Sequence, residues 1–510
     1  MTGNELEWSG RFAGGFINDI KRKLPHYRSD FKDGLHSSVG GATLFLFFAA
    51  LANAIAFGAL TGIMTNNEIG IIEMLVVSAV GGIIFALFSG QPLTILGGTG
   101  PIVIFTGLLY TICAQLKLPF LTVYAWVGIW SGIILLISAF TDASVLMKYF
   151  TRFTDEIFAA LISVIFIVEA IKDIAGAFGS NGYGLSSAFF SVILALGTFT
   201  LSRSFKSFTR TPYLRKWIRT LISDFGPALA ILIMTAIALN FSNVELSTPK
   251  VPDSFGTTSG RAWTVNLFDV PTWVIFASIG PAILAAILLF LDQNITVRIV
   301  NSPDHKLKKG GGYHLDMAIV GMLVLAASFF GLPWIVAATV HSLNHVKSLA
   351  ITKIKILYGG AKQEVITGVR ENRLSPLLIH IMIGGSVFML DYFGYIPMAV
   401  LFGLFLYMGL TSLGGNQFFD RLMLWITDPK LIPKTHYTRH VPLKSIHKFT
   451  LIQLACFVVL WVLKASKLGI LFPLMIAALV PINIWIRRFF PPNHIKALQA
   501  EEHETEDKYV

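Results

Sequence analysis

Three polar side chains in apolar surroundings have the types and spacing that favour ion binding. Asp292 is a lone carboxylate near the end of a long apolar segment, and Thr296 follows one helical turn later on the same face. An isolated charge at the centre of a bilayer costs at least about 2.5–3.5 kcal/mol, so this carboxylate must be paired, protonated or bound to a cation. Together with Thr339, these residues offer hard oxygen atoms that suit a small monovalent cation such as sodium. The alternative is that Asp292 only bonds to a neighbouring helix.

Two interrupted segments indicate an anion site close to this cation site. Ser89–Phe105 and Gly331–Ser342 each combine a Gly or Pro cluster with a threonine and an apolar helix too short to cross a membrane alone. Such segments at matching positions in two halves of a chain are typical of transporters built from inverted repeats. The alternative is that Gly and Pro are simply commoner in membrane helices than in soluble ones.

Each interrupted segment should contain a helix that starts in mid-membrane. The first N–H groups of a helix are unpaired and carry about +0.5 charge, so an anion can satisfy them. Thr99 suits a capping position, Gly100 lets a ligand approach the backbone, and Pro101 suits a first turn. The residues expected to bind the anion are Thr99, Gly100, Pro101, Ala338, Thr339, Val340 and His341.

Three further side chains are weaker candidates. His341 lies one turn into the second short helix, and it serves either as a substrate contact or as a packing residue. Phe166 and Glu169 lie near the outer end of another apolar segment and are expected to line the access path. The alternative for Glu169 is a carboxylate that reaches to the membrane surface.

Composition places the chain among membrane proteins. Of its 510 residues, 54% are hydrophobic and 14% charged, against about 25% charged in soluble domains. There is room for about 12 to 14 spans of roughly 20 residues. P-loop, HExxH, CxxC and GxSxG motifs are absent from the sequence, which argues against an enzyme. The net charge of +11 falls in alternate loops, which favours membrane orientation over nucleic-acid binding.

The alternation of basic loops predicts an all-α protein of fourteen spans with both termini in the cytoplasm. We expect a cytoplasmic lead-in at 1–34, a first repeat of spans 1–7 at 35–241, an extracellular loop at 242–270, a second repeat of spans 8–14 at 271–488 and a cytoplasmic tail at 489–510. The expected spans lie near 38–62, 70–90, 99–116, 121–142, 155–177, 184–203, 225–241, 271–299, 314–331, 338–350, 375–392, 395–411, 448–465 and 468–487.

Several stretches together match one family. They are GQPLTILGGTGPIVIF, TRFTDEIFAALISVIFIVEAI, LDQNITVRIVN, KLKKGGGYHLD, GLPWIVAATVHSLNHV, TGVRENR, YMGLTSLGGNQFFDR and RHVPLKSIHKFTLIQL. Between Phe16 and Arg488 the sequence resembles the bicarbonate transporters of solute carrier family 4, without the large N-terminal cytoplasmic domain of the animal members. The resemblance implies two inverted seven-span repeats, a core of spans 1–4 and 8–11, a gate of spans 5–7 and 12–14, and a homodimer in the plasma membrane.

The resemblance also bears on single residues. Sodium-coupled members carry an Asp at the position of Asp292 that takes part in binding sodium and carbonate or bicarbonate, whereas the exchangers carry Glu. At His341 the exchangers carry Arg and the sodium-coupled members an apolar residue, so His341 fits neither branch. Asn53 stands where the family usually has Pro. The chain is therefore similar to the sodium-coupled branch, with its coupling ion left open.

Three functions remain from the sequence. The first is a secondary transporter of bicarbonate or carbonate, coupled to sodium, that works by an elevator-like movement of core against gate. The second is a sodium-independent chloride/bicarbonate exchanger in which His341 substitutes for the exchangers' cation. The third is a membrane scaffold or channel-like protein with a vestigial site. We expect no enzymatic activity, no cofactor other than sodium as a coupling ion, and no nucleic-acid partner.

Overall fold

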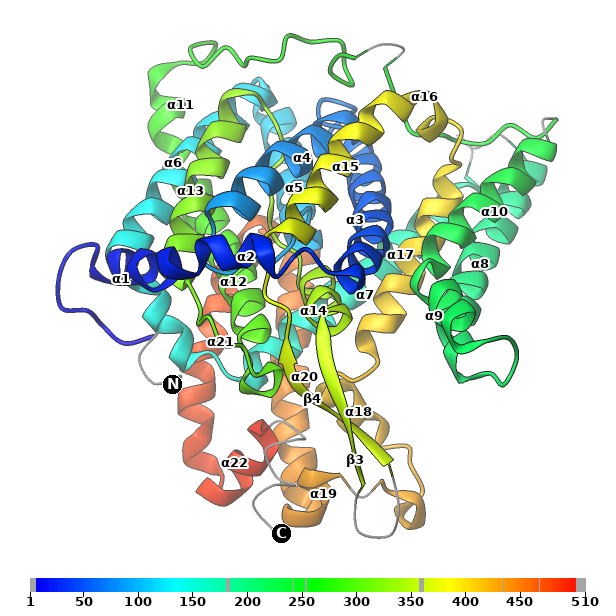
Figure 1. The fold of residues 1–510 in the computed structure, drawn as a ribbon. Helices are drawn as coiled ribbons and strands as arrows, with labels where there is room; N and C mark the ends of the chain where they lie inside the picture. The colour runs from blue at the N-terminus through cyan, green and yellow to red at the C-terminus, as the bar shows by residue number, and fades with distance from the viewer. Residues whose placement is uncertain are drawn as a thin grey trace. The chain divides into compact units, whose positions relative to one another are not determined.

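The computed structural model describes residues 6–179, 184–241, 243–252, 255–356, 362–433, 435–466 and 468–500, and these are mainly α-helical (Figure 1). The chain forms two compact units. The first unit comprises Met1–Val145 and Ala170–Tyr407, and the second comprises Leu146–Glu169 and Met408–Val510.

Most of the helices, long and short, belong to the first unit. They are α1 (Gly14–Lys23), α2 (Tyr27–Lys32), α3 (Ser37–Met64), α4 (Ile71–Phe88), α5 (Gly100–Leu116), α6 (Phe120–Phe140), α8 (Leu185–Ser207), α9 (Lys216–Asp224), α10 (Gly226–Asn240), α11 (Thr272–Ala277), α12 (Ile279–Val300), α13 (Tyr313–Phe329), α14 (Thr339–Ser348), α15 (Leu374–Gly385) and α16 (Leu390–Phe393). Two helices have residues in both units, α7 (Arg152–Gly176) and α17 (Met398–Leu413). The second unit adds α18 (Gln417–Met423), α19 (His436–His440), α20 (Leu443–Ala465), α21 (Phe472–Ile486) and α22 (Pro492–Gln499).

The helices lie where the spans are predicted, but fewer than fourteen of the described ones are long and apolar enough to cross a membrane. Within the described residues, eight helices are long and apolar enough to cross a membrane, or up to ten if each of two sharply bent pairs is one span. Every one of the fourteen predicted spans coincides with a helix, and two of these, α5 and α13, are apolar but shorter. The number of membrane crossings, the domain boundaries, and the predicted tail at 489–510, which lies largely outside the described residues, stay predictions.

Two short antiparallel sheets depart from the expected all-helical architecture. Strand β1 (Leu96–Gly97) pairs with β2 (Val336–Ala337), although these segments are far apart in the sequence. Strand β3 (Ala350–Ile356) pairs with β4 (Lys362–Val369) in a hairpin. This hairpin lies between the expected spans at 338–350 and 375–392. Within β3 only KIKI (Lys353–Ile356) has the period-two alternation of a strand, and the register shifts between Ile351 and Thr352.

Close backbone packing holds the centre of the first unit together. A side chain on Gly132 of α6 would meet the carbonyl oxygen of Gly321 in α13 at 2.9 Å, so α6 cannot carry a larger residue there unless the backbones move apart. Small residues allow such close approach between membrane helices. Nearby, the ring of Trp334 stacks on Tyr124 at a centroid distance of 4.2 Å and an angle of 4°. This packing fixes the unwound segment that leads into β2.

The second unit has a buried charged cluster of its own. Arg421 is fully buried and its guanidinium donates hydrogen bonds of 2.6 Å to Glu156 and 2.8 Å to Gln453. Glu169 forms an ion pair of 3.1 Å with Lys464, and the side chain of Phe166 is buried. The resemblance places the spans of this unit in the gate. However, α8 and α10, which it also places in the gate, group with the first unit.

Candidate functional site

The two interrupted segments lie side by side in the first unit. Leu96 pairs with Ala337 and Gly97 with Val336 in the β1–β2 ladder, so the segments run antiparallel as in an inverted repeat. Helix α5 begins at Gly100, and α14 begins at Thr339. We call the β1–β2 ladder the crossing, because the two interrupted segments meet there. Both short helices start within three residues of it and run away from it in opposite directions. Their unpaired N–H groups give this region a positive electrostatic potential without any basic side chain.

Side chains from α14 and backbone groups lock the crossing. The Ala338 N–H donates to the carbonyl of Ile95 at 2.9 Å, and the Ile95 N–H donates to the hydroxyl of Ser342 at 3.0 Å. One turn further, a ring nitrogen of His345 lies 2.8 Å from the carbonyl of Leu93. These contacts satisfy the buried backbone groups that the unwound segment leaves open.

Thr99 contacts Asp292 instead of capping its own helix. Its backbone takes the capping position of α5, but its side chain makes no capping hydrogen bond, so the expectation that it caps α5 is wrong. The hydroxyl donates to a carboxylate oxygen of Asp292 at 2.7 Å. A charged acceptor binds a hydroxyl proton more strongly than a neutral one, which explains this choice. Asp292 is only 5% exposed, so it belongs to the protein interior of the first unit.

Thr296 and Thr339 meet across the same crossing. Their hydroxyl oxygens are 2.6 Å apart, and the Thr296 oxygen is also 3.2 Å from the carbonyl of Ala337. A carbonyl can only accept, so Thr296 donates to Ala337 and Thr339 donates to Thr296. The side-chain carbonyl of Gln293, on the same helix, accepts the Ala337 N–H at 2.9 Å. Helix α12 therefore contacts the starts of both short helices through the Asp292 carboxylate and the Thr296 hydroxyl, and it contacts β2 through the Gln293 side-chain carbonyl.

A small polar cavity lies beside the two helix starts. It is lined by Asn53, Ser78 and His341 together with the backbone of β1, and its volume for a water-sized molecule is about 10 Å³. That volume is about what one water molecule needs. The side-chain oxygens of Asn53 and Ser78 are buried without a hydrogen-bond partner in the protein. The nitrogen of the Asn53 side-chain amide donates to the carbonyl of Gly98 at 3.2 Å. The cavity thus presents polar atoms ready for a small ligand or a water.

The other predicted site residues are distributed around this crossing. Gly100 and Pro101 are buried in the first turn of α5. Thr339 is exposed and Val340 is 53% exposed in the first turn of α14. His341 is buried, with a ring nitrogen 3.2 Å from the carbonyl of Ala49. The proposed access residues Phe166 and Glu169 belong to the second unit, and their role stays a prediction.

Sequence reasoning missed the residues that hold the turn between α4 and β1. The Arg373 guanidinium donates to the carbonyls of Ala86, Leu87 and Ser89 at 3.0, 3.2 and 2.7 Å, which closes the end of α4. Asp316 accepts the N–H groups of Gly90 and Gln91 at 2.6 and 3.2 Å. Asp316 opens an apolar segment, where a carboxylate needs a partner, so the sequence carried a signal for this residue. Arg373 stands in the polar stretch TGVRENR, and only its burial separates it from an ordinary loop cation.

The donor set fits an alkali-metal ion better than a transition metal. Within the described residues there is no group of three or more His, Cys, Asp and Glu side chains that could hold a metal ion. A cation at the crossing would instead meet one carboxylate and several hydroxyl and carbonyl oxygens. Oxygen-only ligands of this kind suit hard cations.

Comparison with known proteins identifies the family to which this chain is similar. The family model described as the HCO3- transporter integral membrane domain matches residues 11–186 and 179–503. The electroneutral sodium bicarbonate exchanger 1 of Mus musculus is 39% identical over 94% of this chain and 50% of its own length. The sodium-driven chloride bicarbonate exchanger of Homo sapiens is 37% identical over the whole chain and 53% of its own length. The chain thus spans about half the length of these relatives.

A solved structure supports the fold. The transmembrane domain of a cyanobacterium bicarbonate transporter, BicA, superposes with a TM-score of 0.60 at 16% identity, and the match covers 86% of this chain and 97% of that one. At this level of identity the likeness concerns the fold alone. It confirms the predicted class of a mostly helical, multi-pass membrane protein with two inverted repeats.

Proposed function

We propose that this chain, which belongs to the family of bicarbonate transporter integral membrane domains, moves bicarbonate or carbonate across a membrane together with sodium. The family assignment confirms the resemblance deduced from the sequence motifs. The family consists of membrane transporters and not of enzymes. The names of the relatives mention sodium and, for one of them, chloride. We extend the transported ions to this chain as a proposal.

One observation carries the proposal: Asp292 and Thr296 on α12 each contact a threonine at the start of a different short helix. The Thr99–Asp292 and Thr296–Thr339 distances are 2.7 and 2.6 Å. In this proposal sodium binds among Asp292, Thr296 and Thr339 and neutralises the buried carboxylate. Without a cation or a proton, that charge would be costly in a membrane interior.

The anion binds at the starts of the two short helices. Each start carries about +0.5 charge on its unpaired N–H groups. Bound sodium adds a full positive charge next to them and so raises the affinity for a carbonate or bicarbonate anion. Removal of sodium restores the negative charge of Asp292, which repels the anion. Mutual stabilisation of the two ions is the physical basis of their coupling.

Transport then requires the loaded site to face each side of the membrane in turn. We propose an elevator-like movement of a core that holds the crossing against a gate, in a homodimer located in the plasma membrane with both termini in the cytoplasm. The many hydrogen bonds that lock the β1–β2 crossing support a site that moves as a rigid body. Phe166 and Glu169 are proposed to line the access path.

Reconstituted flux with sodium and chloride varied independently tests the proposal. The purified chain in proteoliposomes should take up labelled bicarbonate when an inward sodium gradient is imposed, with or without chloride. Uptake that ignores sodium and follows an opposed chloride gradient would favour the exchanger instead. A folded protein with no flux under either gradient would favour a scaffold.

The exchanger remains a second candidate because His341 lines the cavity beside the helix starts. A cationic imidazole there would attract a chloride or bicarbonate ion without sodium. His341→Leu separates the two candidates. A sodium-coupled transporter should keep its sodium dependence in this variant, whereas an exchanger that relies on His341 should lose chloride-driven flux.

A further inference from the structure

The N-terminal helix pair, α1 and α2 joined by the turn Leu24–His26, has its polar side chains turned inward and its apolar side chains turned outward. The pair spans Gly14–Lys32, and its helix α1 packs against α13 and α6 of the first unit. In a helix on the surface of a soluble protein the apolar face points to the core. The inverted arrangement calls for an apolar or amphipathic environment on the outside.

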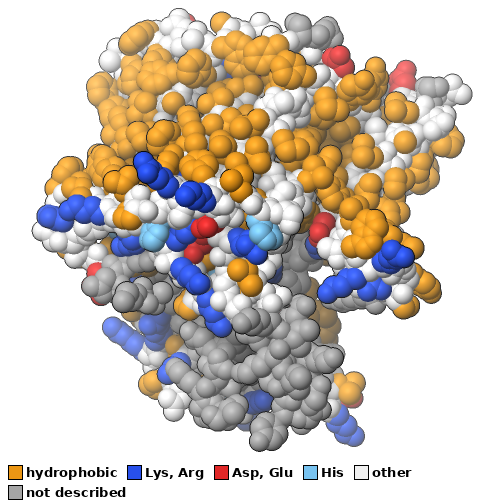
Figure 2. All heavy atoms as spheres, viewed as in Figure 1, with side chains coloured by type: hydrophobic (Ala, Val, Ile, Leu, Met, Phe, Trp, Pro, Cys, Tyr) orange, Lys and Arg blue, Asp and Glu red, His pale blue; other side chains and the backbone are white. Residues whose placement is uncertain are grey.

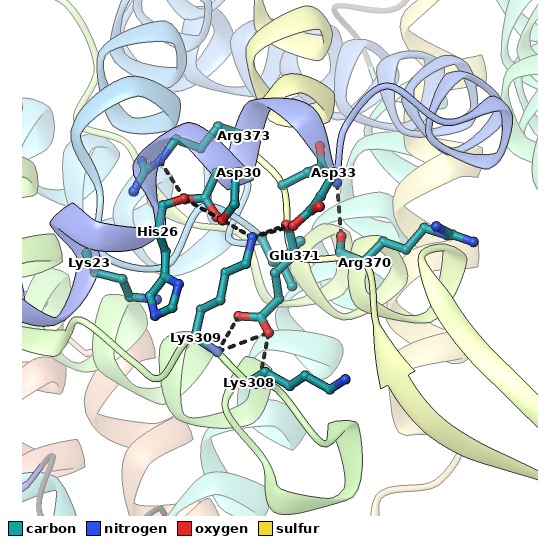
Figure 3. Close-up of polar contacts among 12 residues, drawn as sticks. Lys23, His26, Asp30, Asp33, Lys308, Lys309, Arg370, Glu371 and Arg373 are labelled. Atoms are coloured by element: carbon teal, nitrogen blue, oxygen red, sulfur yellow. Dashed lines mark hydrogen bonds and ion pairs between the residues drawn. The ribbon is translucent and has the colours of Figure 1, made fainter.

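Ion pairs and backbone carbonyls hold the inward face of the N-terminal helix pair (Figure 3). Asp19 accepts the N–H groups of His314 and Leu315 at 2.8 and 3.2 Å and so caps α13. Lys23 is 4% exposed and its ammonium group donates to the carbonyl of Gly310. Asp30 is 1% exposed and pairs with Arg373 and Lys309. The pair is therefore docked mainly by polar contacts, to which Phe16 of α1 adds an edge-to-face ring contact with Phe140 of α6.

Apolar side chains form a continuous stripe along the outside. Ile17, Ile20, Leu24 and Tyr27 recur at helical spacing, which places them on one face. They are 39%, 36%, 70% and 37% exposed. Before the helix starts, Phe12 adds a ring that is 75% exposed. Exposure of this stripe to water is unfavourable, because each apolar side chain would gain hydrophobic free energy on burial.

Basic side chains flank this stripe. Lys21, Arg28 and Lys32 are exposed, and their spacing of seven and four residues places them on a second face beside the apolar one. The acidic residues of the pair, Asp19 and Asp30, are buried in the contacts described above, and the exposed Asp33 that follows binds Lys309 at 2.8 Å. The outward surface of the pair is therefore apolar with a basic edge. Figure 2 shows Lys and Arg side chains gathered across the level of α1 and α2, just below a wide hydrophobic surface.

We propose that the N-terminal helix pair lies in the membrane interface and binds the headgroups of anionic phospholipids with Lys21, Arg28 and Lys32. The apolar stripe enters the acyl-chain boundary, and the basic edge remains at the level of the phosphates. Helices with an apolar face flanked by Lys and Arg bind anionic bilayers in this orientation. The inference does not depend on which ions the chain transports.

A lipid surface fits these residues better than a protein partner does. The stripe is narrow and is bordered by three like charges, whereas the centre of a protein interface is usually depleted in charged residues. The large hydrophobic surface above it in Figure 2 is the part of the molecule that a bilayer covers, and the pair lies at its edge. An anionic leaflet therefore contacts both the apolar and the basic part of the pair at once.

The test compares lipid retention by wild type and by a Lys21→Gln/Arg28→Gln/Lys32→Gln variant. Each protein is exchanged into mixed micelles of detergent, phosphatidylcholine and phosphatidylserine, purified, and analysed for bound lipid by mass spectrometry. One basic residue near an anionic membrane surface raises the binding affinity about fivefold. We therefore expect the ratio of phosphatidylserine to phosphatidylcholine to be several-fold lower in the variant. An unchanged ratio overturns the proposal.

Two controls keep the result specific. A Lys117→Gln/Lys250→Gln/Lys308→Gln variant removes the same charge from exposed positions outside the pair, and it should retain the wild-type lipid ratio. Hydrogen exchange of residues 14–32 should also be slower in vesicles that contain phosphatidylserine than in pure phosphatidylcholine vesicles. If Leu24→Glu instead converts a dimer into a monomer and leaves both lipid measurements unchanged, the stripe binds a second copy of the chain and the lipid proposal is wrong.

Discussion

The hydroxyl of Thr99 and the carboxylate of Asp292, separated by 193 positions in the sequence, are joined by a hydrogen bond of 2.7 Å. This bond links the start of α5 directly to the acidic residue of α12. The matching bond between Thr296 and Thr339 links the start of α14 to the same helix at 2.6 Å. A cation that binds to α12 would therefore influence both short helices, which is what the coupling of a cation to an anion requires.

The Thr296–Thr339 pair should contribute to sodium affinity as a unit. Thr296→Val and Thr339→Val keep side-chain shape but each removes a hydroxyl, and one neutral hydrogen bond is worth about 1 kcal/mol. We expect the sodium concentration for half-maximal uptake to rise about fivefold in each variant. In the double variant this sodium concentration should rise by clearly less than the product of the two single-variant factors, because both substitutions break the same contact.

Thr106→Val provides the matched control for this pair. Thr106 is a buried threonine of the short helix α5, and its hydroxyl donates to the carbonyl of Ile102 in its own helix. Its substitution should leave the sodium dependence unchanged. Strictly multiplicative effects of Thr296→Val and Thr339→Val would show that the two hydroxyls act independently and would contradict the shared site.

The buried pair of Asp30 and Arg373 should matter for stability. Both side chains are 2% exposed and their charged atoms are 3.0 Å apart. Removal of one partner of a buried ion pair typically costs about 3–5 kcal/mol. In the Arg373→Gln variant Asp30 keeps only Lys309 as an ionic partner, at 2.7 Å, and the carbonyl groups at the end of α4 lose their guanidinium donor. Arg373→Gln should therefore lower the thermal unfolding midpoint of the purified protein substantially, and it should also loosen the end of α4.

Arg370→Gln is the control for Arg373. The Arg370 side chain points away from the cluster in Figure 3, and the contact drawn to this residue reaches its backbone carbonyl oxygen, which accepts a hydrogen bond of 3.0 Å from the Asn372 side-chain amide. Its substitution should leave the unfolding midpoint nearly unchanged. The double variant Asp30→Asn/Arg373→Gln should lower the unfolding midpoint by less than the sum of the two single decreases. Equal midpoints for Arg373→Gln and Arg370→Gln would refute a structural role for the pair.

Asp19 should make stability depend on pH. Burial raises the pKa of this carboxyl from 3.8 to about 7, although its ion pair with Arg22 and its hydrogen bonds to the first N–H groups of α13 oppose the increase. The folded protein therefore holds the Asp19 proton more tightly than the unfolded chain does. This contribution to stability is complete below about pH 4 and is lost as the pH rises to about 7.

The variant Asp19→Asn tests this assignment. The amide oxygen can still accept the two N–H groups of α13 but carries no titrating proton. Between pH 5 and pH 7 the unfolding midpoint should fall less steeply in Asp19→Asn than in wild type. Asp33→Asn, at a carboxylate whose side chain is 51% exposed, should follow the wild-type curve. Parallel curves for wild type and Asp19→Asn would rule out the contribution of this residue.

The sequence predicted the helices better than it predicted the contacts between them. Long apolar runs fix where helices lie, and Pro101 and the GLPW stretch mark where two of them begin late. The β1–β2 ladder was not predictable, because each strand has two residues and its partner lies in the other half of the chain. The β3–β4 hairpin was missed because a basic segment between apolar spans was read as a loop.

It was harder to predict which side chains contact one another than to predict which ones belong to the candidate site. Asp292 was identified because an acidic residue in an apolar span needs a partner, but its bond to Thr99 depends on the tertiary fold. The same fold takes the Thr99 hydroxyl away from the capping role that its position suggested. Arg373 looked like one of many loop cations, and only its burial against the end of α4 distinguishes it. Gln293 and Ser342 gave no stronger signal than any polar residue in an apolar segment.

Sodium-dependent bicarbonate uptake by an Asp292→Asn variant in proteoliposomes tests the central claim most directly. The amide preserves the shape and can still accept the Thr99 hydrogen bond, so the protein should fold and unfold with a midpoint close to wild type. The account predicts that a sodium gradient no longer drives bicarbonate uptake in this variant, while Asp292→Glu retains part of it. Full sodium-driven uptake by a correctly folded Asp292→Asn protein would contradict the account.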